Sequence, residues 1–170
     1  MKHCVKNIEM KKMLNKNIPY IPGEIIDVYV GHQINAEKMF ENANVRRREK
    51  TLGFAVQWEI TEDLIDYLET KNKKVIVPED NYLPYDLIID GDYYDVKTSL
   101  NGNTITISDR EAEFAAQNNT QFICLKHRPD LGNYEFEFIK TIDFYDLLEQ
   151  NILRESKYDN GYYVFISDLK

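Results

Sequence analysis

The stretch 83–97 reads LPYDLIIDGDYYDVK and holds four carboxylates and one lysine. Two of these carboxylates, Asp86 and Asp95, are spaced so that they could share a face with the lysine, Lys97. Two carboxylates held close together repel each other unless a cation lies between them. A divalent metal with oxygen ligands is the natural cation. The stretch therefore predicts a metal site with an amine beside it, if the chain brings the two acids together.

A β-hairpin is the element that would bring them together. The apolar run Leu87–Ile89 leads into Asp90-Gly91, and this dipeptide is a strong signal for a two-residue hairpin loop. Counting outward from the loop puts Asp86 opposite Asp95, with Cβ atoms roughly 4.5–5.5 Å apart. The two-residue period of a strand then puts Lys97 on the same face as Asp95. The alternative is a solvated strand face, since charged residues around an Asp-Gly hairpin are common on protein surfaces.

The spacing of these residues resembles the motif of the PD-(D/E)xK nuclease superfamily. In that family the first Asp follows a turn that contains Pro, and a second acid and a Lys close the motif as (D/E)-x-K. The matching pieces here are Pro84-Tyr85-Asp86 and Asp95-Val96-Lys97, with one extra Tyr between Pro and Asp. The surrounding element order, over roughly residues 53–126, is also that of the family's core.

The resemblance implies a metal-dependent endonuclease that hydrolyses phosphodiester bonds in DNA. Asp86 and Asp95 would bind Mg²⁺, with Mn²⁺ as a substitute, and the Val96 carbonyl would be a third ligand. The metal would polarise the scissile phosphate and lower the pKa of a bound water. Lys97 would orient that water or neutralise charge on the transition state.

A helix before the hairpin would supply one more catalytic residue. Residues 51–71 have a helical pattern, with Ile60, Leu64 and Leu68 on one stripe. The family's first core helix often offers a Glu toward the metal, but the helical phase here aligns Gln57 with the apolar stripe. We therefore expect Gln57 to support the water shell. Glu59 and Glu62 fall on the opposite side and are interpreted as a solvated face.

The order of the remaining elements predicts the fold class. We expect an α/β protein with a mixed central β-sheet flanked by helices, as in the restriction-endonuclease-like fold. Strand 121–127 should run parallel to a hairpin strand, because a helix over 108–118 with a capping box intervenes. A strand over 134–139, a helix over 141–153 and a last strand over 162–166 follow. We expect residues 1–50 to form an N-terminal helical extension on a nuclease-like core, 51–170, within a single compact domain.

The acidic composition argues against DNA as a partner and so against the nuclease interpretation. The formal net charge is −8, which argues against a generic nucleic-acid binder. Basic clusters at 46–48 and 71–74 soften this objection, and we expect a homodimer or a protein partner to complete the DNA surface. Two rival functions stay open: a catalytically inactive nuclease-like accessory module, and an acidic protein that mimics nucleic acid. A Mg²⁺ or Mn²⁺ titration separates them, because only a vacant acidic site gains stability from the ion.

Cysteine and hydropathy patterns bound the remaining classes. Two cysteines, Cys4 and Cys124, and three histidines make no recognisable zinc spacing. The chain has neither a long apolar run nor a signal-peptide pattern. We therefore expect a cytoplasmic protein without zinc and without a membrane partner.

Overall fold

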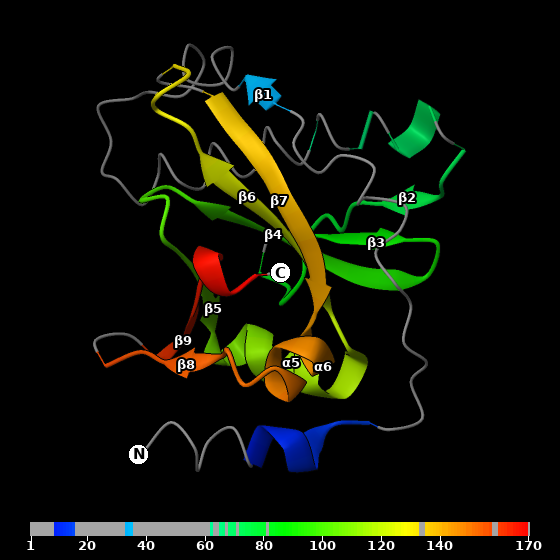
Figure 1. The fold of residues 1–170 in the computed structure, drawn as a ribbon. Coiled ribbons are helices and arrows are strands. Elements are labelled where there is room, and N and C mark those ends of the chain that lie inside the picture. Colours follow the sequence, from blue (N-terminus) through cyan, green and yellow to red (C-terminus); the bar gives the residue numbers. More distant parts are fainter. Residues whose placement is uncertain are drawn as a thin grey trace.

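The computed structural model describes residues 9–15, 33–35, 62, 65–66, 68–70, 72–80, 82–132, 135–157 and 160–169. The elements in chain order are β1 (Gln33–Asn35), β2 (Val75–Ile76), β3 (Leu87–Ile89), β4 (Asp92–Ser99), β5 (Thr104–Ser108), α5 (Asp109–Asn118), β6 (Gln121–His127), β7 (Glu135–Asp143), α6 (Phe144–Glu149), β8 (Arg154–Glu155), β9 (Gly161–Phe165) and the 3-10 turn η1 (Ile166–Asp168) (Figure 1). The described residues at 9–13 and between 62 and 70 are helical.

The strands of the described residues form two sheets. The larger has six strands in the order β1-β7-β6-β4-β3-β2, and the smaller has three in the order β5-β9-β8. Strand β4 pairs with β6 in parallel, while its pairing with β3 is antiparallel, so the large sheet is mixed. The α/β class with a mixed central sheet and the parallel placement of residues 121–127 are confirmed. The physical reason is the helix α5, which carries the chain back to the starting edge before β6 begins.

The hairpin forms with the predicted register. Ile89 pairs with Asp92, and Asp90 and Gly91 are the two loop residues. Both have positive φ, at 49° and 90°, as the commonest two-residue hairpin turn requires. The ladder ends at Leu87, which pairs with Tyr94. Asp86 therefore lies immediately before the ladder, where its backbone N–H donates to the Tyr94 carbonyl at 2.9 Å.

Helix α5 begins with the capping box that the sequence predicts. The Ser108 hydroxyl accepts from the Glu111 N–H at 3.1 Å, and the Glu111 carboxylate accepts from the Ser108 N–H at 2.9 Å. The helix ends at Asn119, which adopts the left-handed conformation with φ of 49°. These bonds fix the first turn, and with it the direction in which Glu111 leaves the helix.

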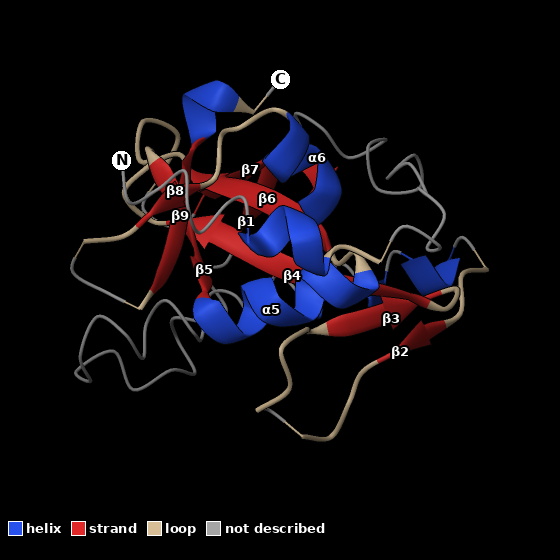
Figure 2. Cartoon of the chain, turned by 90° about the horizontal axis from the view of Figure 1, so that it is seen from below, coloured by secondary structure: helices blue, strands red, loops and turns tan. Residues whose placement is uncertain are grey.

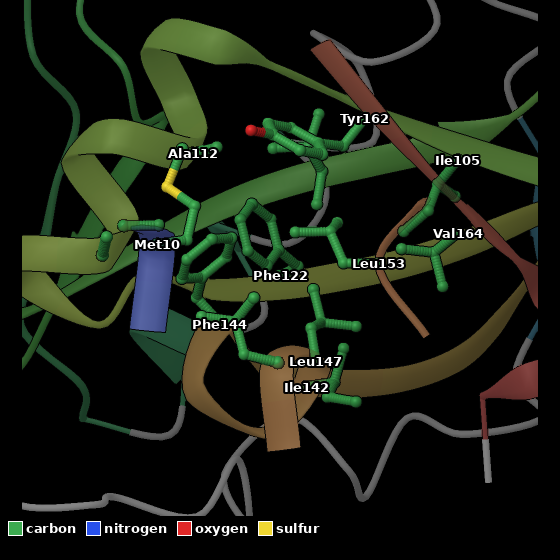
Figure 3. Close-up of a cluster of buried hydrophobic side chains, with 14 of the residues drawn as sticks. Met10, Ile105, Ala112, Phe122, Ile142, Phe144, Leu147, Leu153, Tyr162 and Val164 are labelled. Atoms are coloured by element: carbon green, nitrogen blue, oxygen red, sulfur yellow. The ribbon is translucent and has the colours of Figure 1, made fainter. Parts of the chain in front are cut away.

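The main hydrophobic core lies between the large sheet and the helices (Figure 3). It joins Phe122 of β6, Ala112 of α5 and Leu147 of α6 with Tyr162 and Val164 of β9. Figure 2 shows α5 and α6 in front of strands β4 and β6, so both helices cover one face of the sheet. All the core side chains named here are at most 1% exposed, and their burial is the main term that stabilises this layered arrangement.

Two segments of the first fifty residues contact this fold. Met10 is buried in the core cluster, and the Asn15 N–H donates to the Ala116 carbonyl. Strand β1 pairs with β7 and forms an edge of the large sheet. Short pieces of the predicted extension thus contribute to the core and to an edge of the large sheet. The predicted site residue Gln57 and the basic residues at 46–48 lie outside the described residues, as does most of the helix predicted for 51–71.

The helix predicted for 141–153 is wrong at both ends. Strand β7 continues to Asp143, because Thr141 and Ile142 pair with Ile123 and Phe122 of β6. The helix itself is only the six residues of α6, and β8 follows at Arg154. The apolar residues in this region do recur at helical spacing, but residues 141–143 belong to the sheet ladder. Asp143 then starts α6 as its N-cap, which a strand-to-helix junction requires.

No helix among the described residues is both long enough and apolar enough to cross a membrane.

The buried N-cap Asp143 predicts a pH-dependent stability. Burial raises its pKa from 3.8 to about 6, and the nearby Asp146 carboxylate adds to the shift. Because the folded state prefers the protonated form, stability falls as the pH rises from about 4 to about 6 and stays lower above that. The Asp143→Asn variant keeps a cap oxygen for the Asp146 N–H. We expect it to be more stable than wild type at pH 7 by about 2–3 kcal/mol, with no difference below pH 4.

Urea unfolding of both proteins between pH 3.5 and 7.5 measures this difference. The exposed Glu113→Gln substitution on α5 serves as the control and should follow the wild-type profile. A constant offset between Asp143→Asn and wild type over this range would contradict the prediction.

Candidate active site

Asp95 and Lys97 point from β4 toward α5 and meet there. The Asp95 side chain is 1% exposed, and its Oδ2 lies 3.2 Å from Lys97 Nζ. The Lys97 side chain is 11% exposed. A solvated strand face is therefore excluded for these two residues. A buried acid and a buried lysine in a sheet are costly to keep unless they are paired or serve a function.

Asp86 joins this pair from the start of β3. Its Oδ2 accepts a hydrogen bond from the Val96 N–H at 2.8 Å, which holds the side chain against β4. It lies close enough to Asp95 to raise the pKa of that acid by charge and by hydrogen bonding. The structure thus brings together Asp86, Asp95 and Lys97, as the hairpin arithmetic predicts.

The backbone polar groups of Val96 point toward the Asp86 carboxylate. In an extended strand the N–H and C=O of one residue point to the same edge. The Val96 N–H points to Asp86, and the Tyr94 carbonyl, two residues earlier, also points to that edge. The Val96 carbonyl therefore lies on the edge of β4 where the Asp86 carboxylate sits. This is the position that a third oxygen ligand would need.

Glu111 is a fourth charged residue of the site, and the sequence places it only as part of the predicted capping box. Its two carboxylate oxygens accept from Lys97 Nζ at 2.7 and 2.8 Å. Glu111 thus satisfies the Ser108 N–H and the Lys97 ammonium at once. The capping box was the available signal, since it fixed Glu111 in the first turn. That this turn crosses Lys97 depends on how α5 packs on β4.

An aromatic cluster sets that packing. The ring centroids of Tyr85, Tyr93 and Phe114 lie 4.7–5.2 Å from one another. Tyr93 is two residues before Asp95 and shares its face, and Phe114 is one helical turn after Glu111. The cluster therefore ties α5 to the hairpin at the position that places Glu111 over Lys97.

The charged residues of this cluster differ in how well neighbouring charges stabilise their ionised forms. Burial raises the pKa of Asp95 well above its usual value, and Glu111 and Asp86 add to the shift while Lys97 opposes it. Burial alone would lower the pKa of Lys97, but Asp95 and Glu111 outweigh it and raise that pKa. Burial would likewise raise the pKa of Glu111, yet Lys97 and the hydrogen bonds hold it well below its usual value. Asp95 is therefore the acid whose negative charge is least compensated.

The donor atoms at Asp95 fit a hard divalent cation. Its Oδ2 is buried and accepts no directed hydrogen bond, although the Lys97 ammonium lies near it. Within the described residues no three His, Cys, Asp or Glu side chains form a metal-binding group. The ligands present are two carboxylates and a backbone carbonyl. This small set is enough for Mg²⁺, which commonly binds one or two carboxylates and completes its shell with water and substrate phosphate.

A pocket of about 290 Å³ opens beside Lys97 and Glu111. Its polar lining comes from β4, from the end of β5, from α5 and from the segment before β9: Lys97, Thr106, Ser108, Glu111, Ser156 and Asn160. The pocket therefore connects the buried charged cluster to the surface of the small sheet. Hydroxyl and amide groups at its wall can donate to an oxygen-rich ligand.

Comparisons with known proteins add no assignment to this geometry. No model of a known protein family matches the chain, and a search of curated proteins finds no significant match.

Proposed function

We propose that this protein is a Mg²⁺-dependent DNA endonuclease with a restriction-endonuclease-like core. One observation carries the proposal: Asp86, Asp95 and Lys97 meet at the hairpin, and Asp95 and Lys97 are held almost without solvent under α5. The placement of β4 between an antiparallel β3 and a parallel β6 supports the same fold. Strongly perturbed acids in contact with a lysine are typical of functional sites.

In this mechanism Asp86 and Asp95 would hold the metal, and the Val96 carbonyl would be the third protein ligand. Bound Mg²⁺ would polarise the scissile phosphate and make water a stronger nucleophile. Both carboxylate oxygens of Glu111 accept hydrogen bonds from Lys97 Nζ, which fixes the ammonium beside Asp95. That fixed positive charge can stabilise the negative charge that develops on the phosphate. Gln57 remains the predicted support for the water shell.

An accessory module without catalysis is the second candidate function. The ion pairs of Lys97 with Asp95 and Glu111 favour this accessory function, because an ammonium paired with two carboxylates is poorly placed to contact a phosphate. The acidic composition favours it as well. Under this alternative the ion pair is structural, and the protein binds metal or DNA without cleaving it.

Mg²⁺ should stabilise the protein through this site. At ten times the dissociation constant, a ligand that binds only the folded state contributes about 1.4 kcal/mol. For a chain of this length the melting temperature should rise by about 3–5 °C. Differential scanning fluorimetry with MgCl₂ or MnCl₂, against NaCl of equal ionic strength, measures the rise. The Asp95→Asn variant should show no rise.

Cleavage of DNA decides between the two functions. Supercoiled plasmid and labelled single- and double-stranded oligonucleotides are incubated with the protein in Mg²⁺, in Mn²⁺ and in EDTA. The endonuclease predicts nicked or linear product with either metal and none in EDTA. A metal-dependent rise in melting temperature without any product would support the accessory module. The absence of both would overturn the metal site.

A further inference from the structure

The outward face of the small sheet carries aromatic rings, an arginine and hydroxyl groups. On β9, Tyr163 and Phe165 share this face, and Phe165 is 37% exposed. On β5, Thr106 pairs with Tyr163 and Thr104 pairs with Phe165, so both threonines lie on the same side. On β8, Arg154 also pairs with Tyr163. We call this surface the β5–β9–β8 face.

The rings on this face are held in place by their neighbours. The centroids of Tyr163 and Phe165 lie 5.4 Å apart with an interplanar angle of 88°. The Arg154 guanidinium sits 5.4 Å above the Phe165 ring, and its side chain is 49% exposed. Aromatic rings and an arginine on one exposed sheet surface are the groups on which unpaired nucleobases stack. Hydroxyls beside them can donate to phosphate and sugar oxygens.

This face is continuous with the pocket beside Lys97 and Glu111. Thr106 lines the pocket beside Lys97 and Glu111, and it is also the cross-strand partner of Tyr163. Ser108, one pleat further on, lines the pocket as well. A strand lying along the face would thus reach the pocket over two residues of β5.

We propose that the β5–β9–β8 face binds the bases of single-stranded DNA and leads the strand into the pocket at Lys97. This inference rests on the proposed function for the reaction, and it names single-stranded or flapped DNA as the substrate class. Binding through this face would also explain how an acidic protein could hold DNA. Binding through stacking depends on ring faces, so a chain with net charge −8 can hold a strand with few phosphate contacts.

Binding is measured in EDTA, where no cleavage can occur, with a fluorescein-labelled oligo-dT strand by fluorescence anisotropy. Replacing an aromatic ring with Leu keeps apolar bulk but removes the stacking face. We expect Tyr163→Leu and Phe165→Leu each to weaken binding by about 5- to 100-fold. The ring-preserving Tyr163→Phe should bind close to wild type. Tyr82→Leu is the matched control, because Tyr82 is 80% exposed and lies in the loop before β3.

Melting temperatures confirm that each variant is folded. Wild-type affinity in the folded Leu variants, an equal loss in Tyr82→Leu, or no detectable binding by wild type would overturn the proposal. The result separates this inference from the proposed function. Ring-dependent binding without cleavage in Mg²⁺ would support DNA binding by the β5–β9–β8 face and contradict the nuclease function. Cleavage with unchanged binding in the Leu variants would support the nuclease function and contradict DNA binding by this face.

Discussion

Replacing Asp95 with Asn should abolish metal-dependent cleavage while leaving the protein folded. The substitution keeps the shape of the side chain but removes the charge that binds the metal. Loss of metal binding removes several kcal/mol of transition-state stabilisation, so we expect a fall in cleavage rate of about 10³-fold or more. Because burial makes the charged form of Asp95 unfavourable, the variant should also melt at a higher temperature than wild type without metal.

The combination of lost cleavage and raised melting temperature is the informative outcome. A merely structural role for Asp95 predicts no change in Mg²⁺-dependent stabilisation, and a misfolded variant predicts a lower melting temperature. The control is Asp92→Asn, which changes an acid at the hairpin turn on the same strand. Cleavage by Asp95→Asn at more than a tenth of the wild-type rate would show that the metal is bound elsewhere.

Replacing Lys97 with Met should destabilise the fold strongly, because it leaves Asp95 and Glu111 without their shared cation. Removing one partner of a buried ion pair costs about 3–5 kcal/mol. Adding Glu111→Gln should recover much of this loss. Gln can still accept from the Ser108 N–H, so the capping box survives the second change. Urea unfolding of the two single variants and the double variant gives the coupling energy between Lys97 and Glu111.

Lys126→Met is the matched control for this cycle. Lys126 is half-buried on the neighbouring strand β6, and its substitution should cost about 1 kcal/mol or less. A loss for Lys97→Met no larger than that of the control would mean that the ion pairs contribute little. The cycle also shows how to test catalysis by Lys97. Only the double variant, restored to near wild-type stability, separates a missing amine from an unfolded protein.

The cluster of Asp86, Asp95, Lys97 and Glu111 has three acids and a single lysine. Asp86 and Asp95 are the two acids proposed to bind a metal, and Lys97 lies between Asp95 and Glu111. The cluster therefore holds more acids than cations. Under the proposed function this imbalance favours one more cation, and carboxylate oxygens favour a hard divalent ion.

The local part of the site could be predicted from the sequence. The loop at Asp90-Gly91 is determined by backbone conformations that Asp and Gly tolerate, and it sets the register over the next few residues. The capping box at Ser108 is likewise a short-range pattern. Because a strand has a period of two, the common face of Asp95 and Lys97 follows directly. Their convergence with Asp86 is a consequence of these local rules.

The helix predicted for 141–153 shows where local rules stop. Residues such as Thr141 and Ile142 suit a strand or a helix, and the choice is made by pairing with β6. A similar limit applied to Glu111, whose capping role was visible while its contact with Lys97 was not. That contact depends on the aromatic cluster of Tyr85, Tyr93 and Phe114, which joins segments far apart in the chain.

The sequence by itself thus determined the hairpin, the start of α5 and the convergence of Asp86, Asp95 and Lys97. Only the tertiary structure decided that Glu111 lies over Lys97 and that the pocket joins the site to the small sheet. The physical reason is the range of the interactions. Turns, caps and strand periodicity act over a few residues, whereas helix packing and burial depend on side chains that the chain brings together only on folding.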